Sequence, residues 1–372
     1  MKEPLKNPFT PTFGSIPPQL AGRDQTINDI LRGLDNGPGD PNRATIYVGA
    51  RGSGKTVLLA KIAEEASANG WVSVNVNADS GMLDEIFVQV KENAREFLTP
   101  ESSSHITAIN IGGAGISRSI HKSVQKTTWR SEMTAAIKEL NEKGVGLLIT
   151  VDELNVKTDE ARTLITTFQH FVRERRDVAL IMAGLPQKVS DLLRDDSISF
   201  LRRAFQHHLE PIEESEVRYS MKKTIELAGR KIENHALDFA VKNAKGFPFM
   251  IQLIGYQMWR QHPERKSVSL EDAEEGVCLA QSDLERMIFD RTYRELSEKD
   301  IAFLVAMLDD QEYSAISDVA GRMKVSSKYA GIYRKRLIEQ GIIGGRGYGK
   351  VAFDLPMFRE YMQKRSETYQ KS

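Results

Sequence analysis

The segment that most constrains this chain is a glycine-rich octapeptide, Gly49-Ala50-Arg51-Gly52-Ser53-Gly54-Lys55-Thr56. It has the form G-x-x-x-x-G-K-[ST], and it lies between a short β-type run, Ile46 to Val48, and a helical pattern, Val57 to Ala66. Glycines let the backbone of such a loop turn its N–H groups toward phosphate oxygens, and the positive end of the next helix faces the same anion. The segment therefore predicts a phosphate-binding P-loop within an α/β fold.

Each fixed residue has a predicted role in binding ATP or ADP together with Mg²⁺. Lys55 places a positive charge on the β- and γ-phosphates, and the Thr56 hydroxyl ligates the metal. The alternative, a glycine turn without a ligand, is weakened by the strand before the loop and the helix after it. The predicted nucleotide-binding set from this segment is Gly49, Ala50, Arg51, Gly52, Ser53, Gly54, Lys55, Thr56 and Val57.

A second element is an apolar strand that ends in two carboxylates. Leu147 to Val151 is a nearly continuous apolar run, and Asp152 and Glu153 follow it. The carboxyl ends of parallel strands form the edge where open α/β sheets bind ligands. We expect Asp152 to hold Mg²⁺ through water, and Glu153 to orient and activate the attacking water as the catalytic base alongside Lys55. The alternative is a strand that simply enters a polar loop.

Strand-like and helix-like patterns alternate through the first half of the chain, which is typical of a parallel sheet wrapped by helices. A helix is expected over residues 80–98 and a hairpin over Ile106 to Ile120. From Glu213 no strand pattern appears until about Ile342. We therefore expect an α/β P-loop NTPase domain, a small all-helical lid and a winged helix-turn-helix domain, at residues 1–210, 211–290 and 291–372.

The last of these domains is predicted from the order of its elements. Helical periodicities cover Leu296 to Leu308, Ile316 to Met323 and Ser327 to Gln340, and a hairpin with a glycine-rich tip follows from Ile342 to Phe353. Helix, helix, turn, helix and wing is the order of a winged helix-turn-helix.

Charge is distributed unevenly along the chain. The whole sequence has 51 basic and 51 acidic residues, which excludes a protein that is basic throughout. Residues 321–350, however, contain eight basic residues and one acidic residue, Glu339. This local excess indicates contact with the phosphates of duplex DNA, although winged helices also bind proteins and a basic helix face is often only solvated. The predicted DNA-binding residues are Ser327, Lys328, Arg334, Lys335, Arg346 and Lys350.

Composition sets the expected compartment. The one cysteine, Cys278, cannot form an internal disulfide, which fits a reducing cytosol. No apolar run approaches the roughly 20 residues of a membrane helix, and no signal peptide is evident. We expect a cytoplasmic protein without a membrane partner.

These motifs together resemble the AAA+ and STAND branch of P-loop ATPases, especially initiator-type and archaeal-type ATPases with a C-terminal winged helix. The resemblance extends from about Pro17 to Tyr361. It implies that Gly22 and Arg23 lie against the adenine, and that the Gly246-Phe247-Pro248 turn faces the nucleotide. The alternatives are an ordinary turn before a helix and a loop entering a helix.

Two departures from this family pattern concern hydrolysis. The strand over Val178 to Ala183 continues into Gly184 without a polar sensor residue, and Pro248 stands where a second-sensor arginine is usual. Sensors stabilise charge on the γ-phosphate, so their absence predicts slow hydrolysis. Arg202 and Arg203 are candidates for an arginine finger toward a neighbouring subunit of a homo-oligomer, or form a surface pair.

Two functions fit these features. One is an ATPase whose nucleotide state controls DNA binding through the winged helix. The other is a STAND-like signalling or regulatory switch whose winged helix contacts a protein. A metabolic phosphotransferase is disfavoured, because the chain has no small-substrate motif and the lid and winged helix would have no use in one.

Overall fold

The computed structural model describes residues 5–12, 14–98, 118–154 and 159–371, and the side chains of all of these except 118–128 and 368–371. The chain divides into two compact units. The sheet unit comprises Arg23–Val48 and Lys55–His208, and the helical unit comprises Met1–Gly22, Gly49–Gly54 and Leu209–Ser372. The predicted domain boundaries 1–210, 211–290 and 291–372 stay predictions.

The sheet unit is built on five parallel strands in the order β2-β3-β4-β1-β5. They are β1 (Ala44–Val48), β2 (Val72–Asn77), β3 (Leu147–Asp152), β4 (Val178–Gly184) and β5 (Phe205–His208). Every residue of β3 and β4 is buried, which explains their continuous apolar sequences. The α/β class and the parallel sheet that the sequence predicted are confirmed.

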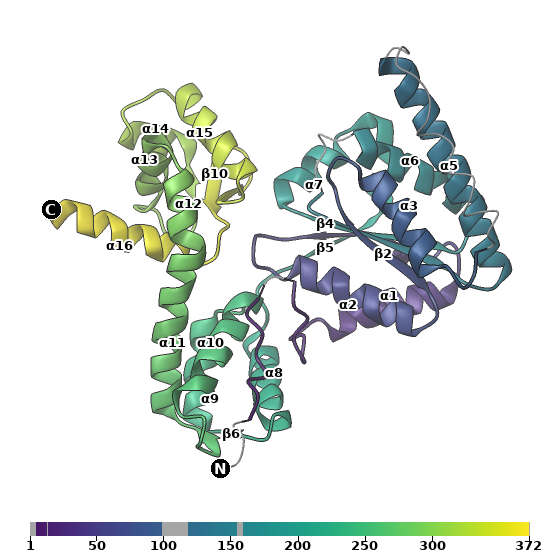
Figure 1. Ribbon diagram of the computed structural model, residues 1–372. Helices are drawn as coiled ribbons and strands as arrows, with labels where there is room; N and C mark the ends of the chain where they lie inside the picture. The colour runs from purple at the N-terminus through teal and green to yellow at the C-terminus, as the bar shows by residue number, and fades with distance from the viewer. Residues whose placement is uncertain (1–4, 13, 99–117, 155–158, 372) are drawn as a thin grey trace. The chain divides into compact units, whose positions relative to one another are not determined.

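Helices cover both faces of this sheet (Figure 1). On one face lie α1 (Asp24–Asn36) and α2 (Lys55–Ala68). The other face packs against α3 (Met82–Asn93), α5 (Arg118–Glu142), α6 (Asp159–Arg173) and α7 (Pro186–Leu193), and these helices form one apolar core with the sheet. Short 3₁₀ segments, Pro41–Arg43 and Asp196–Arg203, precede β1 and β5.

Two expectations for this unit need correction. The helix expected over 80–98 is shorter: it begins after Gly81, which has a φ of 90°, and it ends at Asn93, where Ala94 leaves the helical conformation. There the Glu160 carboxylate accepts hydrogen bonds from the Gly81 and Leu83 N–H groups, at 2.9 and 3.0 Å. Most of the hairpin expected over Ile106 to Ile120, up to residue 117, lies outside the described residues. Its last three residues, 118–120, belong to helix α5 and not to a strand.

The helical unit begins with a four-helix lid: α8 (Glu214–Leu227), α9 (Asn234–Ala244), α10 (Pro248–Gln261) and α11 (Leu270–Leu284). Figure 1 shows α11 continuing through a π-helical segment, Glu285–Phe289, into α12 (Asp290–Glu295). Two strands, β6 (Lys231–Ile232) and β7 (Ser267–Val268), form a small parallel sheet. The expectation of no strand before Ile342 was therefore wrong, because two-residue strands are too short to show alternation.

The C-terminal part of the helical unit has the predicted succession of helices. They are α13 (Glu298–Met307), α14 (Ile316–Arg322) and α15 (Ser327–Glu339), followed by α16 (Phe358–Lys371). The antiparallel strands β9 (Ile343–Gly345) and β10 (Lys350–Phe353) form a hairpin, and the short β8 (Ser314–Ala315) pairs with β10. Ser297 caps α13 through a reciprocal capping box with Asp300, as its sequence indicates.

Candidate nucleotide site and C-terminal basic surface

The glycine-rich octapeptide forms the turn between β1 and α2. Gly52 and Gly54 have φ angles of 78° and 87°, a backbone conformation that residues with a Cβ atom adopt only with strain. At Gly49, a Cβ atom would lie 2.4 Å from the Ser53 Oγ atom, so a larger residue does not fit. The loop thus has the backbone conformation that its three glycines predict, and α2 begins directly after it at Lys55.

Ser53 is the buried polar residue of this loop. It is 4% exposed, and its Oγ atom has no hydrogen-bond partner among the described residues. A buried hydroxyl without a partner is costly. This orphan hydroxyl, next to the glycines and at the N-terminus of a 14-residue helix, fits a loop that encloses an oxygen-rich anion.

The predicted metal ligands meet each other directly. The Thr56 hydroxyl donates a hydrogen bond to Asp152 Oδ2 at 2.5 Å, although the two residues are 96 positions apart. The second oxygen of Asp152, Oδ1, accepts a hydrogen bond from the Glu153 N–H at 2.8 Å. The end of β3 therefore holds its carboxylate beside the first turn of α2.

This pair of oxygens fits Mg²⁺. Magnesium prefers hard oxygen ligands and is usually held by one or two protein groups together with water and substrate phosphates. Within the part of the chain that the structure describes, no group of three or more His, Cys, Asp or Glu residues is placed to hold a metal ion. An all-protein metal cage is therefore not found there, and Thr56 with Asp152 would share the ion with a phosphate.

Glu153 has an unusual backbone. Its φ is 52°, a left-handed conformation that is strained for residues other than glycine and is often found at functional sites. The next residue, Leu154, donates its N–H to the Ala183 carbonyl of β4 at 3.0 Å. This bond holds the loop after β3 against the end of β4, and the Glu153 side chain is exposed.

The end of β4 offers no polar side chain. Met182 and Ala183 are buried, and a Cβ atom at Gly184 would lie 3.0 Å from the Leu154 Cβ atom. Close packing therefore requires glycine at position 184, at the end of the strand where AAA+ proteins have a polar sensor residue.

Within the helical unit, the predicted lid turn lies beside the P-loop. A Cβ atom at Gly54 would lie 3.3 Å from Pro248 Cγ, and one at Gly246 would lie 2.4 Å from the Ile212 carbonyl oxygen. Pro248 begins α10 at a position where its missing N–H costs nothing. The Gly246-Phe247-Pro248 turn is thus packed between the segment at Ile212 and the phosphate loop.

The segment Leu209–Ile212 was missed by the sequence reasoning. Ile212 Cγ2 is 2.9 Å from the position of a Cβ atom at Gly22, and Leu209 Cβ is 3.1 Å from one at Gly49. Gly22, Gly49 and Gly246 therefore all pack against this short segment. The glycines that contact this segment lie far apart in sequence, so a single sequence does not directly indicate that they pack together.

Arg23 lies close to Tyr47 of β1. Burial lowers the pKa of the Arg23 guanidinium, and the nearby Tyr47 partly opposes that change. Burial also raises the pKa of the Tyr47 phenol, as does the charge of Asp29. The Tyr47 hydroxyl is without a hydrogen-bond partner among the described residues. Tyr47 is a further polar group of this region that was not predicted.

The two candidate finger arginines differ in their surroundings. Arg202 donates hydrogen bonds to the Leu193 carbonyl and to Asp196, at 2.7 and 2.9 Å. Arg203 is exposed, and it has no ion pair within the described chain. It ends the 3₁₀ segment two residues before Phe205, the first residue of β5, which is the exposed edge strand of the described sheet and pairs with β1.

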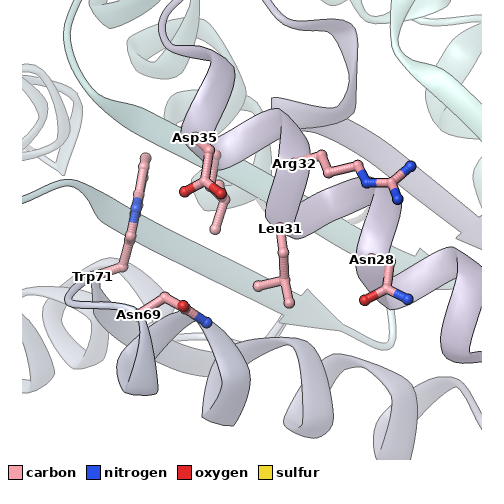
Figure 2. A pocket seen from close by; sticks show the side chains of 7 residues that line it. Asn28, Leu31, Arg32, Asp35, Asn69 and Trp71 are labelled. Carbon is pink, nitrogen blue, oxygen red and sulfur yellow. The ribbon is translucent and has the colours of Figure 1, made fainter.

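A pocket of about 290 Å³ lies elsewhere in the sheet unit. Figure 2 shows Leu31 and Asp35 of α1 on the side nearer to the turn that carries Asn69 and Trp71, whereas the Arg32 side chain points away from that turn. This turn follows the C-terminal end of α2, whereas the P-loop precedes its N-terminal end, about 20 Å away at the helical rise per residue. The pocket is therefore separate from the phosphate loop. Its lining residues are Asn28, Leu31, Arg32, Leu34, Asp35, Asn69 and Trp71.

Helix α15 presents part of the predicted basic surface. Ser327, Lys328 and Lys335 are exposed, and Arg334 is half-buried, with its guanidinium 3.9 Å from the position of a Cβ atom at Gly345 in β9. Ser326 caps this helix by accepting a hydrogen bond from the Tyr329 N–H at 3.2 Å. Of the predicted set, the exposed cations on α15 are thus Lys328 in its first turn and Lys335 in its third turn.

Other cations of the same stretch are already engaged. The Arg346 guanidinium pairs with Asp354 at 2.6 Å, and Lys350 Nζ lies 4.0 Å from the centre of the Tyr313 ring. Outside the predicted set, Arg322 pairs with Asp310 and Arg336 pairs with Asp300. These contacts reduce the charge that the stretch offers to a partner relative to the count from sequence.

Fold and loop together define an α/β P-loop NTPase fold with a helical lid and a C-terminal helical domain. The chain is similar to the ORC2 protein of Aeropyrum pernix in its ADP form, with 14% identity, a TM-score of 0.55 and coverage of 97% of this chain and 98% of that chain. The same protein in its ADPNP–ADP complexes gives 15% identity, a TM-score of 0.51 and coverage of 95% and 97%. The resemblance to initiator-type AAA+ ATPases is confirmed at the level of the fold.

A further solved structure and one family model also match the chain. Cdc6p of Pyrobaculum aerophilum gives 17% identity and a TM-score of 0.49, with coverage of 96% of this chain and 97% of that chain. A family model described as a domain of unknown function (DUF8462) matches residues 286–362. No curated protein matches the sequence. Among the described residues, no helix is both long enough and apolar enough to cross a membrane.

Proposed function

We propose that this chain is an ATP-binding AAA+ ATPase that hydrolyses ATP slowly and couples its nucleotide state to DNA binding through a C-terminal winged helix. The observation that carries the nucleotide part is the hydrogen bond between Thr56 and Asp152. It brings two Mg²⁺-compatible oxygens together at the start of the helix that follows the glycine loop. Lys55 at the same helix start supplies the charge for the β- and γ-phosphates.

Glu153 is the proposed base. Its carboxylate follows the metal-binding Asp152 directly and is exposed to solvent, so it is available to orient a water molecule against the γ-phosphate. Slow turnover is supported by the apolar end of β4 at Ala183 and by Pro248, which occupies the place beside Gly54. Neither residue can stabilise charge that develops on the phosphate. If the chain forms a homo-oligomer, Arg203 is better placed than the engaged Arg202 to act as its arginine finger.

The DNA-binding part is supported by α15 and the hairpin that follows it. We propose that α15 enters the major groove with Ser327 and Lys328 nearest the bases, while Lys335 contacts phosphate. Arg334 beside the β9–β10 hairpin, and Arg346 and Lys350 on it, would contact the DNA backbone. For this, Arg346 and Lys350 would leave their partners Asp354 and Tyr313 for phosphate oxygens.

The nucleotide proposal is tested by calorimetric titration of the purified chain with Mg-ATP and Mg-ADP. Lys55→Ala should abolish measurable affinity, because the site loses the charge that contacts the β- and γ-phosphates. Lys61→Ala, on the same helix α2 but paired with Glu64 and Glu65, is the matched control and should retain binding. Equal affinities in wild type and Lys55→Ala would reject the site.

The DNA proposal is tested by fluorescence anisotropy with a labelled duplex at increasing salt. A surface that contacts several phosphates gives an affinity that falls steeply with salt. Lys328→Glu with Lys335→Glu should weaken binding and flatten that dependence, whereas Lys222→Glu with Lys223→Glu on α8 should not. Absent or salt-independent binding would reject DNA as the partner.

A second candidate is a STAND-like switch whose C-terminal domain binds a protein. The contact between Pro248 and Gly54 favours it, because a lid turn packed on the loop would retain ADP. One equivalent of ADP carried through purification, with no DNA binding at low salt, would decide for this alternative.

A further inference from the structure

The tip of the β9–β10 hairpin carries a fully exposed aromatic side chain. Tyr348 is 104% exposed, the largest exposure of any large apolar side chain in the described chain. Gly347 and Gly349 flank it with φ angles of 91° and 68°, and a Cβ atom at either would meet nothing within 4 Å. The turn thus projects the ring into solvent, where it buries no surface against its own domain.

The cations beside this ring are held back from the tip. Arg346 is paired with Asp354 at 2.6 Å, and Lys350 lies over the Tyr313 ring at 4.0 Å. Both contacts direct positive charge toward the body of the hairpin. The outermost group of the hairpin is therefore an aromatic ring in a positively charged neighbourhood, and not a charge.

That combination fits a nucleic acid better than a protein. Aromatic rings stack on bases, and nearby cations hold the backbone, in sites that bind unpaired strands. The hairpin adjoins α15, whose Lys328 and Lys335 are exposed, and Arg334 lies beside Gly345 at the base of the hairpin. A protein pocket for tyrosine would need apolar walls and acidic rims, whereas a polyanion needs only the stacked base and its phosphates.

Whether Tyr348 stacks on a paired or an unpaired base depends on the free energy needed to expose the face of that base. Inside an intact duplex both faces of every base are covered, so a ring can stack only by prising a base step apart. A base that is already unpaired has a free face and escapes that cost. We propose that Tyr348 is a stacking site for an unpaired base, so that the chain prefers duplex DNA that contains a bulge or a single-strand junction. This inference rests on the proposed DNA binding.

The test compares two labelled DNA molecules, an intact duplex and the same duplex with one bulged aminopurine base, whose fluorescence falls when it is stacked. Wild type should bind the bulged DNA about tenfold more tightly than the intact duplex and quench the aminopurine. Tyr348→Ala should bind both with equal affinity and without quenching. Tyr348→Phe, which keeps the ring, should restore both effects.

The control is Tyr219→Ala, which removes another tyrosine, 56% exposed, from α8 of the same unit, and it should retain the preference. If wild type binds neither DNA, the proposed function and this inference fail together. If wild type binds the duplex with steep salt dependence but shows no preference, or if Tyr348→Ala keeps the preference, only this inference is overturned. Because Tyr348 buries nothing, its replacement should leave the thermal unfolding temperature unchanged.

Discussion

Lys245 Nζ lies 2.5 Å from Glu360 Oε1, although the two residues are 115 positions apart. Lys245 is the C-cap residue that follows α9, with a φ of 49°. It directly precedes Gly246, whose turn reaches Gly54 of the P-loop through Pro248. Glu360 lies in α16. A single ion pair thus connects the turn beside the phosphate loop with the C-terminal helix.

We expect this ion pair to carry part of the coupling between nucleotide and DNA. Lys245→Ala or Glu360→Gln should bring the DNA affinities measured with ATP and with ADP closer together, since allosteric coupling is typically about 1–3 kcal/mol in total. Both side chains are about half exposed, so unfolding should become easier by less than about 1 kcal/mol. The charge swap Lys245→Glu with Glu360→Lys should recover part of the coupling, and a swap that recovers none would count against the ion pair.

Glu153 combines a strained backbone with a proposed catalytic carboxylate. Glu153→Gln keeps the backbone and should retain ATP affinity while lowering turnover at least tenfold, because general-base catalysis contributes about 10²–10⁴-fold. Glu153→Gly removes the carboxylate and should therefore also lose turnover. It also removes the backbone strain of a non-glycine residue at a φ of 52°, so it should raise the free energy of unfolding by about 1 kcal/mol. Steady-state ATPase assays and thermal unfolding measure the two effects, and unchanged turnover in Glu153→Gln would disprove the assignment.

Gly246 and Gly144 provide a matched pair for the lid turn. Both have positive φ angles, 71° and 72°, but a Cβ atom at Gly246 would lie 2.4 Å from the Ile212 carbonyl oxygen, whereas one at Gly144 would meet nothing within 4 Å. Gly144→Ala should cost only the backbone strain, about 1 kcal/mol. Gly246→Ala must also displace the Ile212 backbone, so it should cost distinctly more and weaken ATP binding. Chemical denaturation compares them, and equal losses would show that the contact is unimportant.

The sequence predicted those parts of the molecule that depend on local patterns. The apolar runs of β3 and β4 and the periodicity of α15 required no knowledge of distant residues. The expectation that Asp152 lies at the ligand-binding edge followed from the rule that parallel strands end at one edge. Strands of two residues such as β6 left no pattern to detect. The packing of Ile212 against Gly22 and Gly246 depends on contacts between distant segments, which one sequence cannot display.

The amount of unpaired positive charge between residues 321 and 350 was predicted least accurately from the sequence. Counting residues gave eight cations against one anion between 321 and 350. The anions that engage Arg322 and Arg336, namely Asp310 and Asp300, lie outside that window, and so does Asp354, the partner of Arg346. A local count cannot include partners that only the fold brings near.

One of these ion pairs predicts how stability changes with pH. The hydrogen bond from Arg322 lowers the pKa of the Asp310 carboxyl to about 2, from about 3.9 in an unfolded chain. A lowered carboxylate pKa stabilises the fold fully above the unfolded value, and this stabilisation is lost as pH falls through the folded value. Because the Arg322 side chain is 30% exposed and Asp310 23% exposed, solvent screening limits the effect to about 1 kcal/mol or less.

Arg322→Gln should therefore lower the unfolding temperature by a constant amount from pH 7 down to about pH 4, and the gap to wild type should narrow between about pH 4 and pH 2 as Asp310 is protonated. Arg291→Gln is the control, because its pair with Glu295 is 83% and 63% exposed and pairs of that kind contribute little. Calorimetric scans of the three proteins across this range make the comparison. A gap for Arg322→Gln that stays constant down to pH 2 would mean that Arg322 stabilises the fold through its hydrogen bond to the Ala306 carbonyl, which does not titrate, and not through Asp310.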